Sequence, residues 1–295
     1  GNPLKGDIVK KFSITTGVMQ EIDTLFLAGK TYTQIRANQG FKYCETIIAP
    51  QYHTFTGLPV QEIIHALVRG IMRAEKDNPG IEVNLLLGVG REVSPERAVE
   101  LVEMFSECNK EIRPYLAGIN LVCDEAKNPP EKHIKMFKRA KQLGWKTACH
   151  VGEWVHNPDT QVPDLYRDLP QLVKNIRTAI FDLEVDRLEH AIGLPYAPEL
   201  MEAVRAIKLG VAGCPGSYLC SELLPNKDVS VLKLREMLDS GIAYSLGPDD
   251  DLFMMNLNEV FQICNDRYRF TEEERRQLLL NPWLTRFGNR KEHKP

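Results

Sequence analysis

Four short motifs combine histidines, carboxylates and a cysteine in a way that suits hydrolytic chemistry. Each follows an apolar run: His150-Val151-Gly152-Glu153, Glu189-His190, Cys214-Pro215-Gly216-Ser217 and Asp249-Asp250-Asp251. Imidazole nitrogen and carboxylate oxygen are ligands that zinc prefers, and the same groups serve as general acids and bases. Seen singly, such motifs are more often a hydrogen-bonded histidine, a solvated glutamate or a turn. Their shared position after an apolar run favours one common, metal-binding site.

The apolar runs have the length of strands. They lack strict in-and-out alternation, which is typical of parallel strands that are buried on both faces. The predicted strands are Tyr43–Ala49, Val83–Val89, Leu116–Val122, Thr147–Val151, Arg187–His190, Val211–Cys214 and Ala243–Leu246.

Boundary signals place helices between these strands. Ser94-Pro95 is typical of an N-cap followed by the first helical residue, and Thr271-Glu272-Glu273-Glu274 reads as a capping box. Glycines that follow apolar stripes mark the ends of other helices. The helices predicted from such signals are one after Pro59, one after Ser94, Pro130–Leu143, Pro198–Leu209, Val231–Leu238 and one after Thr271.

Alternating strands and helices predict a parallel α/β fold over residues 1–295, taken as one domain. A doubly wound sheet would need a glycine fingerprint after a strand, and Gly88-Val89-Gly90 lacks the third glycine. A TIM-type (β/α)8 barrel instead predicts reactive residues at the carboxyl ends of several strands, as seen after four of the seven. The barrel is therefore favoured, although only seven strands are found where a closed barrel needs eight.

Composition excludes several classes of partner. The 295 residues carry 37 Lys+Arg and 40 Asp+Glu, so a net charge of −3 gives no basic footprint for nucleic acid or for an anionic membrane. No apolar run approaches the roughly 20 residues of a membrane span. Seven scattered cysteines without a Cys-x-x-Cys argue against disulfides and predict reduced core residues in a cytoplasmic protein. These features leave the oligomeric state open.

The motifs together resemble the adenosine/AMP/adenine deaminase family, which consists of zinc-dependent barrels of the amidohydrolase superfamily. The family patterns His-Ala-Gly-Glu, Arg-Leu-Gly-His-Gly, Cys-Pro-x-Ser and Ser-Leu-x-x-Asp-Asp-Pro occur here in order. The matching segments are His150–Glu153, Arg187–Ala191, Cys214–Ser217 and Ser245–Asp251, with weaker likeness at Phe12–Gln20 and Tyr43–His53. The resemblance covers nearly the whole chain.

The resemblance implies a role for each residue type. His150 and Asp249 would bind Zn²⁺, and Glu153 would protonate the purine ring nitrogen beside the reacting carbon. His190 would orient the attacking hydroxide, and Asp250 would hydrogen-bond the base. Zinc-bound water ionises near pH ~7, which makes hydroxide available for attack. The implied reaction converts adenosine, a purine nucleoside, into inosine plus ammonia.

Some positions depart from the family pattern. Cys123 replaces the glycine whose backbone N–H usually meets the purine, so it stays a candidate for substrate binding with a narrower approach. Glu189 and Ala191 stand where glycines are usual, and Asp251 stands where proline is usual. These changes leave nucleoside, nucleotide and free base open, with a 6-aminopurine as the expected substrate.

The family's first strand supplies two further zinc ligands in a His-x-His pair, and this sequence has no His-x-His. Of the other histidines, His156 is a conceivable spare ligand and His65 is expected to be structural. We expect the chain to be an N-terminally truncated version of a longer enzyme; the alternative is a catalytically inactive purine-binding or scaffold protein. Phosphoester or amide hydrolysis is disfavoured, because no lysine stands at a strand end to bridge two metals.

Overall fold

The computed structural model describes residues 8–156 and 164–291. By its internal contacts the chain forms two compact units. The N-terminal unit comprises Val9–Val122, Lys135–Thr147 and Arg286–Pro295, and the C-terminal unit comprises Gly1–Ile8, Cys123–Ile134 and Ala148–Thr285. No described helix is both long and apolar enough to cross a membrane.

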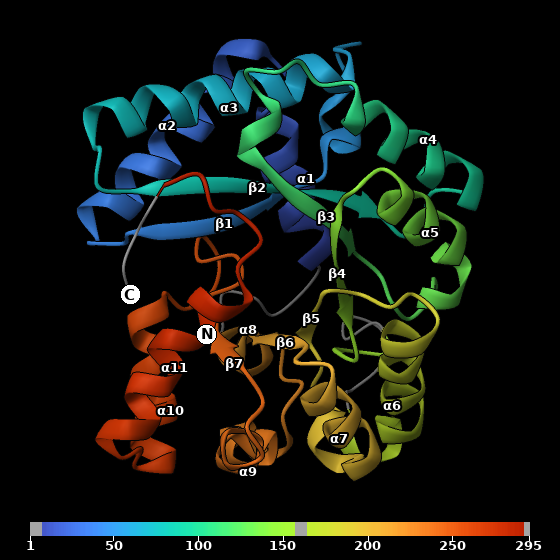
Figure 1. The fold of residues 1–295 in the computed structure, drawn as a ribbon, viewed down its shortest axis with the longest axis vertical. Coiled ribbons are helices and arrows are strands. Elements are labelled where there is room, and N and C mark those ends of the chain that lie inside the picture. The colour runs from blue at the N-terminus through green and yellow to red at the C-terminus, as the bar shows by residue number, and fades with distance from the viewer. Residues whose placement is uncertain (1–7, 157–163, 292–295) are drawn as a thin grey trace. The chain divides into compact units, whose positions relative to one another are not determined.

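The sheet of the N-terminal unit is parallel and its strands follow in chain order (Figure 1). Strands β1 (Tyr43–Ile48), β2 (Glu82–Gly90) and β3 (Leu116–Val122) pair along it. All nine residues of β2 are buried, including Glu82 and Asn84. This explains why the strand shows no alternation in sequence, because parallel strands are covered on both faces.

Helices cover this sheet, and the helices Ile22–Asn38 (α2) and Val60–Asp77 (α3) pack closely against each other. An added Cβ on Gly29 would lie 2.2 Å from the Leu67 carbonyl oxygen, and one on Gly70 would lie 2.0 Å from the Phe26 carbonyl oxygen. Glycine is therefore required on each helix where the two cross. The helices of this unit are α1 (Ile8–Val18), α2 (Ile22–Asn38), α3 (Val60–Asp77), α4 (Pro95–Ser106) and α5 (Ile134–Gln142), with 3-10 turns at Pro50–His53 and Arg113–Tyr115.

Arg290 closes the amino-terminal end of the same sheet. Its guanidinium pairs with the buried Glu75 at 2.7 Å, donates to Asn84 Oδ1 at 2.8 Å, and stacks 3.7 Å over the Tyr115 ring. The backbone N–H of Val83 also donates to Glu75, so several donors satisfy the oxygens of this buried carboxylate. Arg290 thereby ties α3 to β2 and to the turn that precedes β3.

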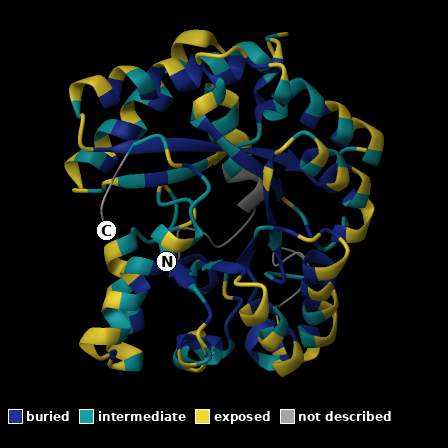
Figure 2. Cartoon of the chain, viewed as in Figure 1, coloured by how far each residue is buried: buried dark blue, intermediate teal, exposed yellow. Residues whose placement is uncertain are grey.

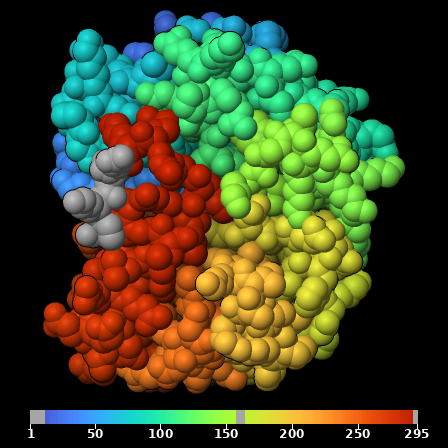
Figure 3. Space-filling model, in the orientation of Figure 1, coloured from blue at the N-terminus to red at the C-terminus, as the bar shows by residue number. Residues whose placement is uncertain are grey.

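The C-terminal unit is also a parallel sheet in chain order. Its strands are β4 (Lys146–Val151), β5 (Arg187–His190), β6 (Gly210–Gly213) and β7 (Tyr244–Leu246). The strands are largely buried, whereas the helices expose their outer faces (Figure 2). Helices α6, α7, α10 and α11 form much of this unit's surface in the space-filling view (Figure 3).

The helices of the C-terminal unit are α6 (Leu165–Phe181), α7 (Pro198–Ala206), α8 (Pro215–Cys220), α9 (Leu234–Asp239), α10 (Leu257–Tyr268) and α11 (Glu272–Thr285), with 3-10 turns at Pro130–His133, Leu194–Tyr196, Pro225–Lys227 and Val229–Leu232.

The predicted α/β class and all seven predicted strands are confirmed among the described residues. Consecutive parallel strands separated by helices are the pattern of a TIM-type barrel, and the described residues supply seven such strands where a closed barrel has eight. The helix boundaries were less accurate. The segment predicted as Val231–Leu238 begins its α-helix only at Leu234, because Lys233 adopts a left-handed conformation with φ 47°. The prediction of a single domain stays a prediction.

All seven cysteines carry free thiols in the structure. Four of them are buried, at Cys44, Cys108, Cys149 and Cys264. Cys123 corrects the expectation that every cysteine fills the core, because it is exposed in the loop that follows β3. Its side chain faces solvent since the sheet ends one residue earlier, at Val122.

Candidate active site

The carboxyl ends of β4 to β7 bring the predicted site residues to one edge of the C-terminal unit. Val151 of β4 is in register with His190 of β5, which places His150 and His190 on adjacent strands. Their imidazole rings lie 4.8 Å apart between centroids, at an interplanar angle of 61°. Cys214 and Asp249 follow β6 and β7 at the same edge.

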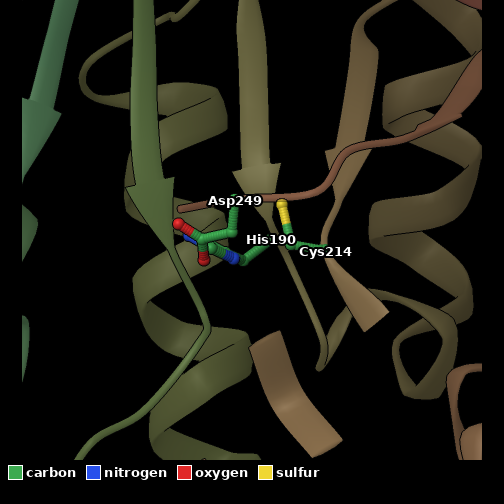
Figure 4. A group of neighbouring side chains, drawn as sticks. All are labelled: His190, Cys214 and Asp249. Carbon is green, nitrogen blue, oxygen red and sulfur yellow. The ribbon is translucent and has the colours of Figure 1, made fainter. Parts of the chain in front are cut away.

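Three of these side chains point toward one another and form a donor set (Figure 4). A ligand atom of His190, one of Cys214 and one of Asp249 all lie within 4.8 Å of each other. Nitrogen, sulfur and oxygen are all ligands that Zn²⁺ accepts in proteins. The residue types therefore fit a zinc ion, which is the metal that the family resemblance implies.

The electrostatics of the site also favour a cation. Burial raises the pKa of the Cys214 thiol well above its usual value, and the negative charges of Asp249, Glu189 and Glu153 raise it further. Three carboxylates that act on one buried group produce a strongly negative local potential. A divalent cation would relieve this potential and stabilise the thiolate.

Glu153 and Tyr218 flank His190 on opposite sides. Glu153 Oε2 lies 3.6 Å from His190 Nε2, and the Tyr218 hydroxyl lies 3.2 Å from His190 Nδ1. The same hydroxyl accepts the backbone N–H of Cys214 at 2.9 Å. Both ring nitrogens of the buried His190 thus face a polar group, which fixes the orientation of the ring.

Unusual backbone conformations direct these side chains. Cys123, His190 and Asp249 have φ values of 77°, 68° and 61°, and Ala191 follows with 50°. L-residues rarely adopt this left-handed region, and it recurs where surrounding structure holds a functional site. His190 is the last residue of β5 and Asp249 follows the end of β7 by three residues, so each donor atom enters the site at or soon after a strand end.

Asp250, to which the family resemblance assigns substrate binding, lies in the turn after β7. Its Oδ1 accepts the N–H of Leu252 at 3.1 Å. Burial raises the pKa of the Asp250 carboxyl to about 6, and repulsion from Asp249 and Asp251 adds to the shift. Asp250 is therefore both a turn residue and a carboxyl group with an elevated pKa beside the donor set.

Two other predicted candidates lie outside the donor set found among the described residues. The ring of His150 contacts the ring of His190, which belongs to the donor set. His156, the conceivable spare ligand, has its Nε2 3.5 Å from Asp168 Oδ1. Sequence reasoning had not assigned Cys214 as a ligand or Tyr218 as a partner of His190; their only signal was the Cys-Pro-x-Ser motif and the residue that follows it.

This architecture defines a TIM-type α/β barrel with hydrolase-like groups at the carboxyl ends of its strands. The family model for adenosine deaminase matches residues 6–294, so the chain belongs to the adenosine deaminase family of aminohydrolases.

Individual relatives agree with the family assignment. An uncharacterized deaminase from Schizosaccharomyces pombe is 30% identical over 253 residues, which cover 85% of this chain and 68% of that protein. The crystal structure of an adenine deaminase from Arthrobacter aurescens has a TM-score of 0.81 at 20% identity, over 98% of this chain and 83% of that one. A Zn-bound amidohydrolase from Burkhoderia ambifaria has a TM-score of 0.78 at 24% identity, over 92% and 70%. These two structural likenesses confirm the fold.

Proposed function

We propose that this chain hydrolytically deaminates a 6-aminopurine nucleoside, converting adenosine and water into inosine and ammonia. The observation that carries the proposal is the convergence of His190, Cys214 and Asp249 within 4.8 Å, with Glu153 beside His190. In this reaction a water oxygen adds to C6 of the purine, the ring nitrogen N1 gains a proton, and the bond from C6 to the exocyclic nitrogen then breaks. Family membership supports the reaction class.

The chain offers a set of groups for a zinc ion at this edge. His150 and Asp249 are the ligands that the family resemblance implies, and the donor set adds Cys214 and His190 as further candidates. A bound zinc ion supplies hydroxide by lowering the pKa of its water. The negative potential from the surrounding carboxylates favours retention of the cation.

The other residues of the site have roles that follow from where protons must be donated and accepted during the reaction. Glu153, as a neutral acid, donates a proton to N1 as the water oxygen adds to C6. His190 is held between Glu153 and Tyr218 and orients the attacking oxygen. We assign to Asp250 a hydrogen bond with the base, and to the backbone N–H of Cys123 a hydrogen bond with the purine ring. Each group acts within hydrogen-bond reach of the purine in this proposal.

Adenine is the second candidate substrate, because the Arthrobacter aurescens protein with the same fold is an adenine deaminase. Comparing ammonia release from adenosine, adenine and AMP distinguishes the nucleoside, the base and the nucleotide. Release from none of them, with binding of purine retained, would instead identify a non-catalytic purine-binding protein.

The acid assignment is tested by Glu153→Gln in zinc-supplemented protein. This change keeps the shape but removes the transferable proton, so the rate of ammonia release should fall by about 100-fold or more. Zinc content, measured by atomic emission, should stay the same. Glu131→Gln, at an exposed position in the 3-10 turn Pro130–His133, is the matched control and should keep full activity. Full activity in Glu153→Gln would overturn the assignment.

A further inference from the structure

A buried carboxylate outside the donor set holds the backbone of the proposed acid. Glu125, which is 2% exposed, follows β3 by three residues. Its Oε1 accepts the N–H of Gly152 at 2.9 Å, and its Oε2 accepts the N–H of Glu153 at 3.3 Å. Asn175 of α6 donates to the same Oε1 at 2.7 Å. One carboxylate therefore spans two consecutive peptide groups.

Those two peptides belong to neither a helix nor a strand. β4 ends at Val151, and Gly152 turns the chain with φ 65°. The carbonyl oxygen of Gly152 accepts the N–H of Ile192 at 2.9 Å, so this residue is tied on its other side to the exit of β5. The backbone of Gly152 and Glu153 is thus held by Ile192 on one side and by Glu125 on the other. The direction of the Glu153 side chain therefore depends on the hydrogen bonds to Glu125.

We call the two hydrogen bonds from Gly152 and Glu153 to Glu125 the clamp, and helix α6 supports it. Gln171 of α6 donates to Asn175 Oδ1 at 2.6 Å, which orients the Asn175 amide so that its N–H faces Glu125. A buried carboxylate is tolerated when several donors satisfy it, and such charge-assisted hydrogen bonds are stronger than neutral ones. Glu125 is thus a rigid acceptor that is supported from α6.

We propose that Glu125 is a positioning residue for the deamination: by accepting the N–H groups of Gly152 and Glu153, it holds the Glu153 carboxyl beside His190. The distal end of Glu153 shows the result, with Oε2 3.6 Å from His190 Nε2. Glu125 does not touch the substrate in this proposal and acts only through Glu153. The catalytic part of the inference rests on the proposed function.

Glu125→Gln tests the clamp with the smallest change of shape. If the amide oxygen takes the Oε1 position, Gly152 and Asn175 stay satisfied while an NH₂ group faces the N–H of Glu153. We expect kcat to fall by about tenfold while KM changes by less than about twofold, because a misplaced acid affects the transition state more than binding. In the Glu153→Gln background the same change should cause no further loss, since the group on which it acts is gone.

Full additivity of the two substitutions would overturn the proposal. Glu75→Gln is the control for loss of a buried carboxylate: Glu75 accepts the N–H of Val83 in the N-terminal unit, so this variant should lower stability but leave kcat unchanged.

Hydrogen exchange gives a readout that does not need turnover. The amides of Gly152 and Glu153 should exchange about tenfold faster in Glu125→Gln, and unchanged exchange would also overturn the proposal. If wild-type protein releases no ammonia from any aminopurine, the proposed function fails. The exchange rates of the Gly152 and Glu153 amides then test by themselves whether Glu125 holds this backbone.

Discussion

Several residues at or soon after strand ends hold left-handed backbone conformations. His190 and Asp249 hold left-handed conformations and carry donor atoms, whereas Cys123 holds one with φ 77° and an exposed side chain. A left-handed L-residue costs roughly 1–2 kcal/mol relative to its relaxed conformation. Glycine avoids this cost but loses about 0.5–1 kcal/mol more in chain entropy on folding. At Cys123 the free-energy cost of the left-handed conformation therefore exceeds the entropic cost that glycine would add.

Cys123→Gly should therefore stabilise the protein by about 0.5 kcal/mol, measured as the change in the free energy of urea unfolding. Cys123→Ala is the matched control, because it removes the sulfur and keeps the strained conformation. The alanine variant should show no gain. Equal stabilisation by both variants would contradict the strain argument and attribute the effect to the thiol.

At the scale of elements, two arginines join the helices at the end of the chain. Arg235 of α9 pairs with Glu274 of α11 at 2.6 Å, and Arg267 of α10 pairs with Asp228 at 2.8 Å. Glu274 also completes the predicted capping box by accepting the N–H of Thr271 at 2.7 Å. The hydrogen bond from Arg235, and next those from Thr271, lower the pKa of Glu274 to about 2 against the effect of burial.

The lowered pKa of Glu274 predicts how stability depends on pH. In the unfolded chain a glutamate titrates near pH ~4.3. The stabilisation is therefore complete above that pH and is lost as the pH falls toward about 2, where the folded carboxyl is protonated. Glu274→Gln should cost about 1 kcal/mol of unfolding free energy at neutral pH, and the difference from wild type should shrink on acidification.

Glutamine can still complete a capping box, so this variant isolates the charge of Glu274. Glu272→Gln is the control: its carboxylate is exposed and lies 3.8 Å from Arg275, so it should change the unfolding free energy little. A Glu274→Gln deficit that stays constant between neutral and acidic pH would show that the Arg235 pair does not produce the stabilisation.

For the molecule as a whole, metal binding should be linked to stability. Zinc that binds only the folded chain stabilises it by about 2.7 kcal/mol at 100 times the dissociation constant. For a chain of this size we expect a rise of about 5 °C in melting temperature when zinc is added to chelator-treated protein. Calorimetry with and without zinc measures this rise.

Asp249→Asn should abolish most of the zinc-dependent rise. Asparagine has the same shape and tolerates the left-handed conformation of Asp249, so the main change is the loss of a charged ligand. Asp251→Asn, two residues further along the chain, should keep the response to zinc. An undiminished response in Asp249→Asn would exclude this carboxylate as a ligand.

The sequence by itself determined the α/β class and the position of the strands. Apolar runs such as Leu85–Val89 and Leu116–Val122 are long enough to be recognised and too continuous to be anything but buried in a parallel sheet. Parallel strands also place their carboxyl ends at one edge, which is why the site could be predicted in outline. Helix ends were less predictable: Pro130–Leu143 divides into a 3-10 turn and α5 at Ile134, because local turn geometry is decided by packing.

Only the tertiary structure decided which atoms meet. Cys214 joins His190 and Asp249 in the donor set whereas His150 does not. Side-chain direction differs at each strand end: His190 and Asp249 have left-handed backbones, whereas Cys214 has φ −123°. Glu125 reaches Gly152 and Glu153 across 27 and 28 residues of sequence, a contact that no local pattern encodes. Residue types and spacing fix which groups are present at an edge, but distances of a few ångströms are set by the packing of elements that are far apart in the chain.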